Sequence, residues 1–192
     1  MEETTFLTVP GLASSGPAHW QTLWEKDFPT KFRRVEQTNW DLPVCRDWVE
    51  RLNEEIQKLQ NPVYLIAHSL GCLTVIHWAK NYSSDHIKGV FLVAPADAET
   101  SRNLSFVEGF SPIPRIQLPF ESVVIASTND QYASIERTAE FAQAWGSKFI
   151  NIGVKGHINA NSRIGIWPQG QTLLESFIKS VEEKQKAFIE VE

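Results

Sequence analysis

Cysteines and metal-ligand patterns are scarce in this sequence. Among its 192 residues only Cys45 and Cys72 are cysteines, and two thiols cannot form the framework of a disulfide-rich secreted scaffold. No histidines and acidic residues are spaced as in H-E-x-x-H, and no glycine-rich loop of the Rossmann or P-loop kind occurs. The sequence therefore predicts a protein without a metal or a cofactor.

Long apolar runs and basic clusters are missing as well. The longest wholly apolar runs are about five residues, whereas a membrane span needs roughly 18. Lysines and arginines are scattered and the formal net charge is −5, so we expect no membrane and no nucleic acid as partner. The chain opens with Met-Glu-Glu and then an apolar strand, unlike the basic and long apolar segments of a secretory signal. We therefore expect a cytoplasmic protein.

The composition is that of an ordinary globular domain, with 42% hydrophobic and 21% charged residues. Short apolar, β-branched runs recur along the chain and predict strands covered on both faces. They lie at residues 6–9, 32–36, 63–67, 90–93, 123–126 and 148–151. Between them apolar residues repeat at steps of three and four, which predicts helices. This alternation predicts one α/β domain over residues 1–192, with a mostly parallel sheet of about six strands and helices on both faces.

One segment, residues 96–120, breaks the alternation. It has no clear period and contains prolines at 112, 114 and 119. A long irregular segment inside a compact domain is usually functional, and this one follows a strand end, where α/β sheets carry their sites. Two interpretations stay open: a partial cover over a pocket, or a packed surface excursion.

The most informative stretch is residues 63–72, which read VYLIAHSLGC. An apolar strand ends, Ser69 follows, and a helix begins, which is the setting of the nucleophile elbow G-x-S-x-G. Gly71 meets the demand of this sharp turn for a very small side chain, and Ala67 stands where the first glycine usually lies. The start of the helix directs backbone N–H groups at the developing charge. An ordinary strand-to-helix turn capped by a serine is the competing interpretation.

An acid and a base follow two later strands, in the order Ser, acid, His that this kind of site uses. Asp130 comes after the strand at 123–126, and His157 comes after the strand at 148–151. Because parallel strands end at one sheet edge, both can converge on Ser69. His157 is then the predicted base, and Asp130 the acid that orients it. Asp97, after the strand at 90–93, is a rival acid that we rank below Asp130.

Two backbone donors are expected to form an oxyanion hole. Leu70 N–H is one, because it follows the nucleophile. The other should come from the loop after the first strand, residues 9–16, which read VPGLASSG. Gly11 allows a close backbone approach, which favours Leu12 N–H, with Ala13 N–H as the open alternative. This loop and residues 96–120 are expected to line the pocket with aromatic and aliphatic groups, which favours a substrate with an apolar acyl or side-chain group.

Other nucleophiles and bases are interpreted as structural. Cys72 falls inside the helix after Ser69 and is expected to be a small buried residue. His68 precedes the nucleophile and is expected at the pocket, although its side chain leaves the turn in another direction. His19, near the start of the first helix, could approach the pocket mouth, although packing or a surface position is favoured.

Several segments together resemble the serine hydrolases related to retinoblastoma-binding protein nine, a compact branch of the α/β-hydrolases. The elbow HSLG at 68–71 is shared by many hydrolases, whereas SGPAHW at 15–20 and GHINA at 156–160 are more particular. The likeness covers almost the whole chain. Its other segments are VPG at 9–11, QTNWDLP at 37–43, STND at 127–130 and WPQG at 167–170.

This resemblance implies a compact α/β-hydrolase fold without the large cap domain of bigger relatives. It also implies the same triad, carried onto Ser69, Asp130 and His157. Ala67 and Arg163 depart from the family pattern, and neither is a triad member. The L-x-C-x-E peptide associated with retinoblastoma protein is not matched, because residues 70–74 read LGCLT, so that partner is not carried over.

Two hypotheses of different classes follow. The first is a serine hydrolase, esterase-like or amidase-like, that forms an acyl-enzyme with a small acyl substrate and needs no cofactor. The alternative is a catalytically silent binding or interaction module that keeps the same fold. Covalent reactivity of Ser69 separates the two.

Overall fold

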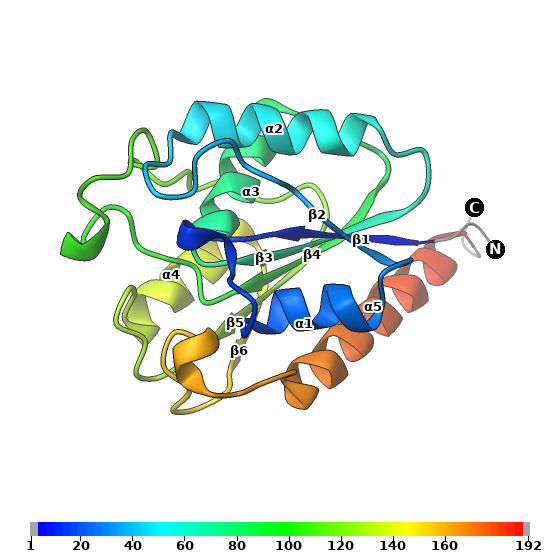
Figure 1. Ribbon diagram of the computed structural model, residues 1–192. Coiled ribbons are helices and arrows are strands. Elements are labelled where there is room, and N and C mark those ends of the chain that lie inside the picture. The colour runs from blue at the N-terminus through cyan, green and yellow to red at the C-terminus, as the bar shows by residue number, and fades with distance from the viewer. Residues whose placement is uncertain (1–3, 190–192) are drawn as a thin grey trace.

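Six parallel strands form the centre of the computed structural model, which describes residues 4–189 (Figure 1). They lie in the order β2-β1-β3-β4-β5-β6, and every neighbouring pair is parallel. Their bounds are β1 Thr5–Val9, β2 Phe32–Arg34, β3 Val63–His68, β4 Ile87–Val93, β5 Glu121–Ala126 and β6 Lys148–Asn151. The predicted parallel α/β sheet is confirmed, and its strand ends share one edge.

Helices cover both faces of the sheet (Figure 1). On one face, α2 (Cys45–Gln57), α3 (Leu70–Asn81) and α4 (Ile135–Trp145) contribute to one apolar cluster. On the other face, α1 (Trp20–Asp27) and α5 (Pro168–Ile189) contribute to a second cluster. None of the helices in the described chain combines the length and the apolar character that crossing a bilayer requires. The inner strands β3, β4 and β5 are therefore buried on both faces, as their apolar composition predicts, whereas the edge strand β6 is largely exposed.

Two strands differ from their predicted bounds. β4 begins at Ile87 rather than at residue 90, because Ile87 and Gly89 pair with β3. The polar Lys88 and the glycine interrupt the apolar run that marks a buried strand. β2 ends at Arg34 rather than at residue 36 and, at the edge of the sheet, pairs only with β1.

Buried tryptophans attach the helices to the loops beside the carboxyl ends of the strands. The Trp20 indole N–H donates to the Ile158 carbonyl at 2.9 Å, and the Trp24 indole N–H donates to the Ile166 carbonyl at 2.6 Å. Both indole rings lie in the core, at 0% and 1% exposure. A buried indole needs such an acceptor, so these bonds fix α1 against the loop that follows β6.

Residues 96–120 form an excursion that ion pairs attach to the body of the protein. Arg137 of α4 donates to the Asp97 carboxylate at 2.8 Å. Within the excursion, Arg115 donates to the Glu99 carboxylate at 2.7 Å. Arg137 also contacts Glu99. The excursion is thus held to α4 by a cluster of two acids and two arginines.

Candidate active site

The nucleophile elbow arises from close contact between β1 and the turn after β3. Ser69 adopts φ 55° and ψ −122°, which a residue other than glycine rarely holds. Its N–H donates to the Val93 carbonyl at 3.0 Å. A Cβ on Gly71 would lie 2.1 Å from the Val9 carbonyl oxygen, so a glycine is required there. Ala67, at the departure from the elbow pattern, is fully buried in β3.

Ser69, His157 and Asp130 form one continuous chain of hydrogen bonds. Ser69 Oγ lies 2.7 Å from His157 Nε2, and His157 Nδ1 lies 2.8 Å and 2.9 Å from the two Asp130 carboxylate oxygens. The Ser69 residue is 7% exposed, and the side chains of His157 and Asp130 are 6% and 4% exposed. The structure thus brings together the three side chains that the sequence pattern singles out. Ser69 and His157 are 88 residues apart in the sequence, and Asp130 and His157 are 27 apart.

The contacts of His157 determine which tautomer this arrangement favours. A carboxylate only accepts hydrogen bonds, so Nδ1 of His157 carries the proton that faces Asp130. The other nitrogen, Nε2, is then unprotonated and accepts the hydrogen bond from the Ser69 hydroxyl. Such a group can remove the hydroxyl proton as the oxygen attacks a substrate carbonyl.

Two neighbouring side chains hold the acid and base loops together. Asn129 Oδ1 accepts from the Gly156 N–H at 2.8 Å and from the Ser127 hydroxyl at 3.1 Å. Ser127 Oγ also accepts from the Lys155 N–H at 2.9 Å. These bonds join the loop after β5 to the loop after β6. Asn129 and Gly156 directly precede Asp130 and His157 in the sequence. The sequence analysis missed this role, although both side chains lie in the segment STND.

Gly11 and Leu12 face the elbow from the loop after β1. A Cβ on Gly11 would lie 2.8 Å from Ser69 Cβ and 3.2 Å from the Leu70 nitrogen, so this loop touches the start of α3. Ala13 N–H donates to the Trp40 carbonyl at 3.2 Å and is therefore engaged elsewhere. Among the described residues no acceptor binds the Leu12 N–H. This geometry favours Leu12 over Ala13 as the second oxyanion donor.

The same loop is strained after Leu12. Ala13, Ser14 and Ser15 have φ values of 60°, 66° and 48°, and they follow one another in the short helix η1 (Leu12–Ser14) and its cap. The left-handed region costs an L-residue about 1–2 kcal/mol, so three such residues in sequence need tertiary contacts that hold them.

Two further histidines lie behind the base. His68 Nε2 is 2.9 Å from the His157 carbonyl oxygen, and the two rings are 4.9 Å apart. His19 packs against His68 with 4.6 Å between ring centres. Of the positions considered for His19, the surface is wrong, because His19 is 4% exposed; it packs against His68 and lines the pocket. His68 lines the same pocket, as expected.

Burial keeps both histidines neutral. Burial, followed by the neighbouring His19 and His157, lowers the pKa of His68 well below its usual value. Burial, with the nearby Arg34 and His157, lowers the pKa of His19 to about 3. A neutral His68 can donate its Nε2 proton to the His157 carbonyl, and neither ring competes with His157 for a proton at neutral pH. Sequence adjacency to Ser69 was the only signal for His68.

The rival acid Asp97 is engaged outside this chain of hydrogen bonds. Its carboxylate accepts from the Thr100 hydroxyl at 2.6 Å, from Arg137 at 2.8 Å and from the Glu99 N–H at 3.0 Å. Burial opposes its ionisation, but these hydrogen bonds and the Arg137 charge outweigh burial and lower the pKa of Asp97. Asp97 is therefore a structural anion that fastens the excursion to α4.

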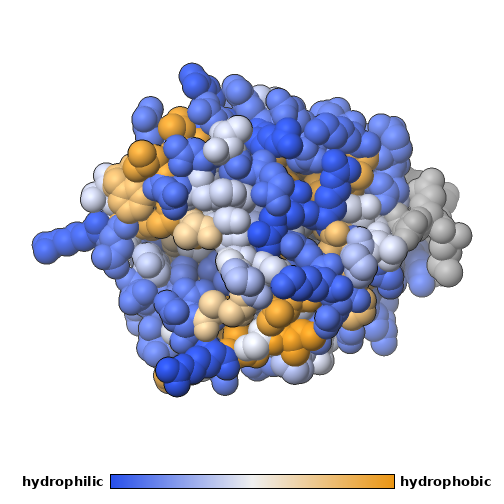
Figure 2. Space-filling view, viewed as in Figure 1, coloured by the Kyte–Doolittle hydropathy of each residue, from blue (hydrophilic) through white to orange (hydrophobic). Residues whose placement is uncertain are grey.

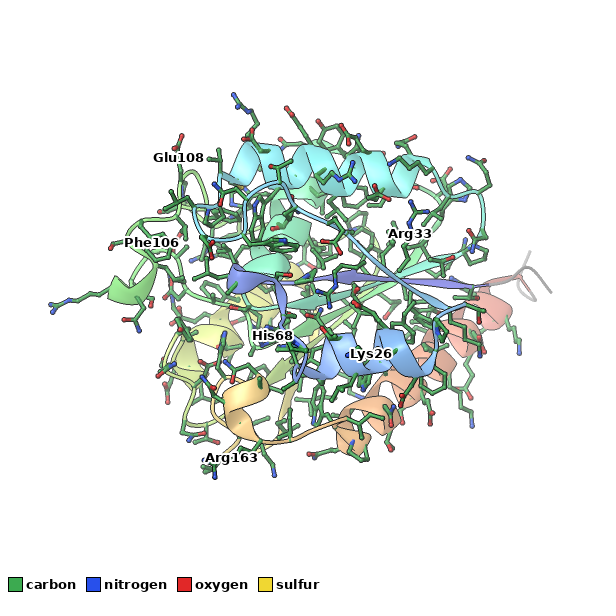
Figure 3. The ribbon with its side chains drawn as sticks, viewed as in Figure 1. Lys26, Arg33, His68, Phe106, Glu108 and Arg163 are labelled. Atoms are coloured by element: carbon green, nitrogen blue, oxygen red, sulfur yellow. The ribbon has the colours of Figure 1, made fainter. Side chains whose placement is uncertain are left out.

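A cavity of about 250 Å³ opens beside Ser69. Its lining comes from the loop after β1 with His19, from His68, from Tyr132, and from His157 and the residues that lead into η3 (Ala160–Ser162). Only Leu104 comes from the excursion, although all of residues 96–120 are described. Figure 2 shows a hydrophobic patch at the left, over the segment of the excursion that also carries Phe106, which is 47% exposed and labelled in Figure 3.

The lining of this cavity corrects the sequence analysis. The loop after Gly11 lines the cavity as expected, with Leu12 and Ala13 among its lining residues. An aromatic and aliphatic wall from the excursion is wrong, since the excursion contributes Leu104 alone. Asn159 and Asn161, which the sequence analysis did not assign to the pocket, contribute to it. Apart from the histidines, no ionisable side chain except Tyr132 lines this cavity in the described chain, and no group of three or more metal-ligand side chains is found there.

The sequence matches the family described as "Serine hydrolase" over residues 6–176. A structure described as a YdeN-like hydrolase from Pectobacterium atrosepticum is 34% identical, with a TM-score of 0.83, and the match covers 93% of this chain and 92% of that chain. The ydeN product of Bacillus subtilis is 20% identical, with a TM-score of 0.76 and coverage of 92% and 99%. A thermophilic esterase from Thermogutta terrifontis shares the fold at 13% identity, with a TM-score of 0.63 and coverage of 93% and 90%. No curated protein matches the chain.

Proposed function

The chain belongs to the serine hydrolase family, and on this premise we propose that it cleaves small acyl esters, or related acyl compounds, through an acyl-enzyme on Ser69. One observation carries the proposal. The hydrogen bonds from Ser69 to His157 and from His157 to Asp130, at 2.7 Å and 2.8 Å, supply a nucleophile, a base and an orienting anion in one line.

The proposed reaction has two steps of the same kind. His157 Nε2 takes the hydroxyl proton while Ser69 Oγ bonds to the acyl carbon, and the carbonyl electrons move to the oxygen. Collapse of this intermediate breaks the bond to the leaving group, which receives the proton from His157. Water then attacks the acyl-enzyme in the same way, releases the acid and restores Ser69.

The N–H groups of Leu12 and Leu70 are proposed to bind the oxyanion of each intermediate. A donor in this position is worth roughly 3 kcal/mol of transition-state stabilisation. Asp130 stabilises the imidazolium that forms on His157 and keeps its ring in the required tautomer.

The cavity supports a short and uncharged acyl group as substrate. Its volume of about 250 Å³ must hold the reacting carbonyl as well as the acyl chain, and it offers no arginine or lysine for an anionic group. A carboxylate buried there would lose hydration without gaining an ion pair. We therefore expect acyl length and charge to limit the reaction.

A series of p-nitrophenyl esters tests this proposal. We expect kcat/KM to be highest for the acetyl to butyryl esters and to fall about tenfold or more by the octanoyl ester, because overpacking in a fixed cavity costs about 1–3 kcal/mol. The hemisuccinate ester should be poorer than the butyrate ester. Faster cleavage of long or anionic acyl groups would contradict the proposed substrate class, and Ser69→Ala gives the background rate.

A further inference from the structure

Arg34, at the end of β2, makes hydrogen bonds with all three of its guanidinium nitrogens. Nε donates to both Glu25 carboxylate oxygens at 3.0 Å and 3.1 Å. Nη1 donates to the Ser14 carbonyl at 2.7 Å, and Nη2 donates to the Thr22 hydroxyl at 2.5 Å. The side chains of Arg34 and Glu25 are 15% and 18% exposed. The guanidinium group is therefore fixed by α1 and at the same time bound to the loop after β1.

The acceptors on that loop belong to its strained residues. Ser14 accepts directly from Arg34, and the Ser15 carbonyl accepts from the Thr22 hydroxyl, which itself accepts from Arg34. Ser15 Oγ also donates to Gln21 Oε1 at 2.7 Å. Carbonyl groups turn with the backbone, so these bonds hold the orientation of the peptide units that follow the left-handed residues.

The loop so held is the one that carries the proposed oxyanion donor. Leu12 lies two residues before Ser14, and Gly11 touches Ser69 and the Leu70 nitrogen. If Ser14 relaxed to an ordinary backbone conformation, the peptide units before it would turn as well. An N–H directed at a developing oxyanion must be held in place before the reaction, because reorienting it during the reaction removes its advantage.

We propose that Arg34 is a positioning residue for the oxyanion hole: it holds the strained loop at residues 13–15 and thereby directs the Leu12 N–H at the reacting oxygen. The proposal rests on the proposed function, since it assigns Arg34 to the same reaction. Arg34 does not line the cavity and touches no substrate, so its effect passes through the loop.

The neighbouring Arg33 provides a matched control on the same strand. Its guanidinium binds the Glu55 carboxylate of α2 at 2.6 Å and makes no bond to residues 12–15 within the described chain. Figure 3 shows it below α2, apart from the labelled His68 that precedes Ser69. A loss of activity that arises from weakening the edge strand would therefore affect variants at both arginines.

The test compares Arg34→Lys, Thr22→Val and Arg33→Lys. A lysine keeps the charge opposite Glu25, but its single ammonium cannot reproduce the planar fork that binds carboxylate, carbonyl and hydroxyl together. Thr22→Val keeps the ion pair and the side-chain shape while removing the link to Ser15. Measurements are kcat and KM for p-nitrophenyl butyrate, the Ki of phenylboronic acid, and hydrogen exchange of residues 12–16 in the full chain.

We expect Arg34→Lys to lower kcat about 10- to 100-fold with KM changed less than about threefold, since loss of one oxyanion donor costs up to 10²–10³. The Ki should rise in parallel, because the boronate adduct also places an oxygen in the hole. Hydrogen exchange at residues 12–16 should accelerate. Thr22→Val should change kcat, Ki and exchange in the same direction as Arg34→Lys. The kcat of Arg33→Lys should stay within about twofold of the wild-type value.

Two results would overturn the role of Arg34. One is that Arg34→Lys and Thr22→Val both keep the kcat, the Ki and the hydrogen-exchange rates of the wild type. The other is an equal loss of kcat in Arg33→Lys, which would point to the edge strand. If the wild type neither cleaves the ester nor binds the boronic acid, the proposed function is contradicted. In that case hydrogen exchange still tests the loop contact, and unchanged exchange at residues 12–16 in Arg34→Lys would reject it.

Discussion

Asp130→Asn is expected to lower kcat/KM about 10⁴-fold, because an amide no longer requires the His157 tautomer that leaves Nε2 free to accept the Ser69 proton. Both Asp130 oxygens lie within 2.9 Å of His157 Nδ1, and one also accepts from the Tyr132 N–H at 2.9 Å. The amide is isosteric, so the fold should be retained. Steady-state kinetics on a short ester, with circular dichroism as the check on folding, measures the effect.

Asp97→Asn is the matched control, since Asp97 is the rival acid. We expect activity within about threefold of the wild type and a loss of about 1–3 kcal/mol of unfolding free energy, because Arg137 loses the most buried of its charged partners. The folded-state pKa of Asp97 lies below the unfolded value, so this stabilisation is complete at neutral pH and is lost as the pH falls below about 4. A large loss of activity in Asp97→Asn, with Asp130→Asn active, would make Asp97 the catalytic acid.

Gly71→Ala is expected to destabilise the protein by about 3 kcal/mol or more, which lowers Tm by roughly 6–12 °C for a chain of this size. Its new methyl would lie 2.1 Å from the Val9 carbonyl oxygen and 2.6 Å from the Pro10 carbonyl oxygen. Backbone atoms of a central strand cannot move aside as a flexible side chain can. The elbow would have to separate from β1, which would also displace Ser69. Thermal unfolding measures the loss.

Gly16→Ala is the control for this effect. Gly16 lies in the same region of the molecule, yet a Cβ there would meet no heavy atom within 4 Å. Its Tm should stay within about 2 °C of the wild type, since surface changes usually alter stability by less than 0.5 kcal/mol. Equal Tm values for Gly71→Ala and the wild type would show that the elbow does not need the close contact with β1.

The sheet could be predicted from the sequence because its inner strands are buried on both faces and read as apolar runs. β3 and β5 are clear for this reason, whereas the start of β4 was missed at Lys88 and Gly89, where pairing with β3 overrides composition. Ser69, Asp130 and His157 could be singled out because each follows a strand and parallel strands end at one edge.

The supporting contacts could not be predicted in this way. Arg34 binds Ser14 across 20 residues, and His68 meets the His157 carbonyl across 89 residues. Neither pairing leaves a periodic or spaced pattern in the chain, because each depends on how a loop packs against the end of a strand that is distant in the sequence. The contribution of Asn159 and Asn161 to the pocket was missed for the same reason, since their loop reaches the pocket only through tertiary packing.

Intact-mass analysis after treatment with a fluorophosphonate probe tests the central claim most directly, because this reagent reacts with an activated serine. The wild type should gain a single adduct, and Ser69→Ala should gain none under the same conditions. Ser105→Ala, which removes an exposed serine outside the site, should label like the wild type. A folded wild type that gains no adduct, or an adduct that persists in Ser69→Ala, would contradict the assignment of Ser69 as the nucleophile.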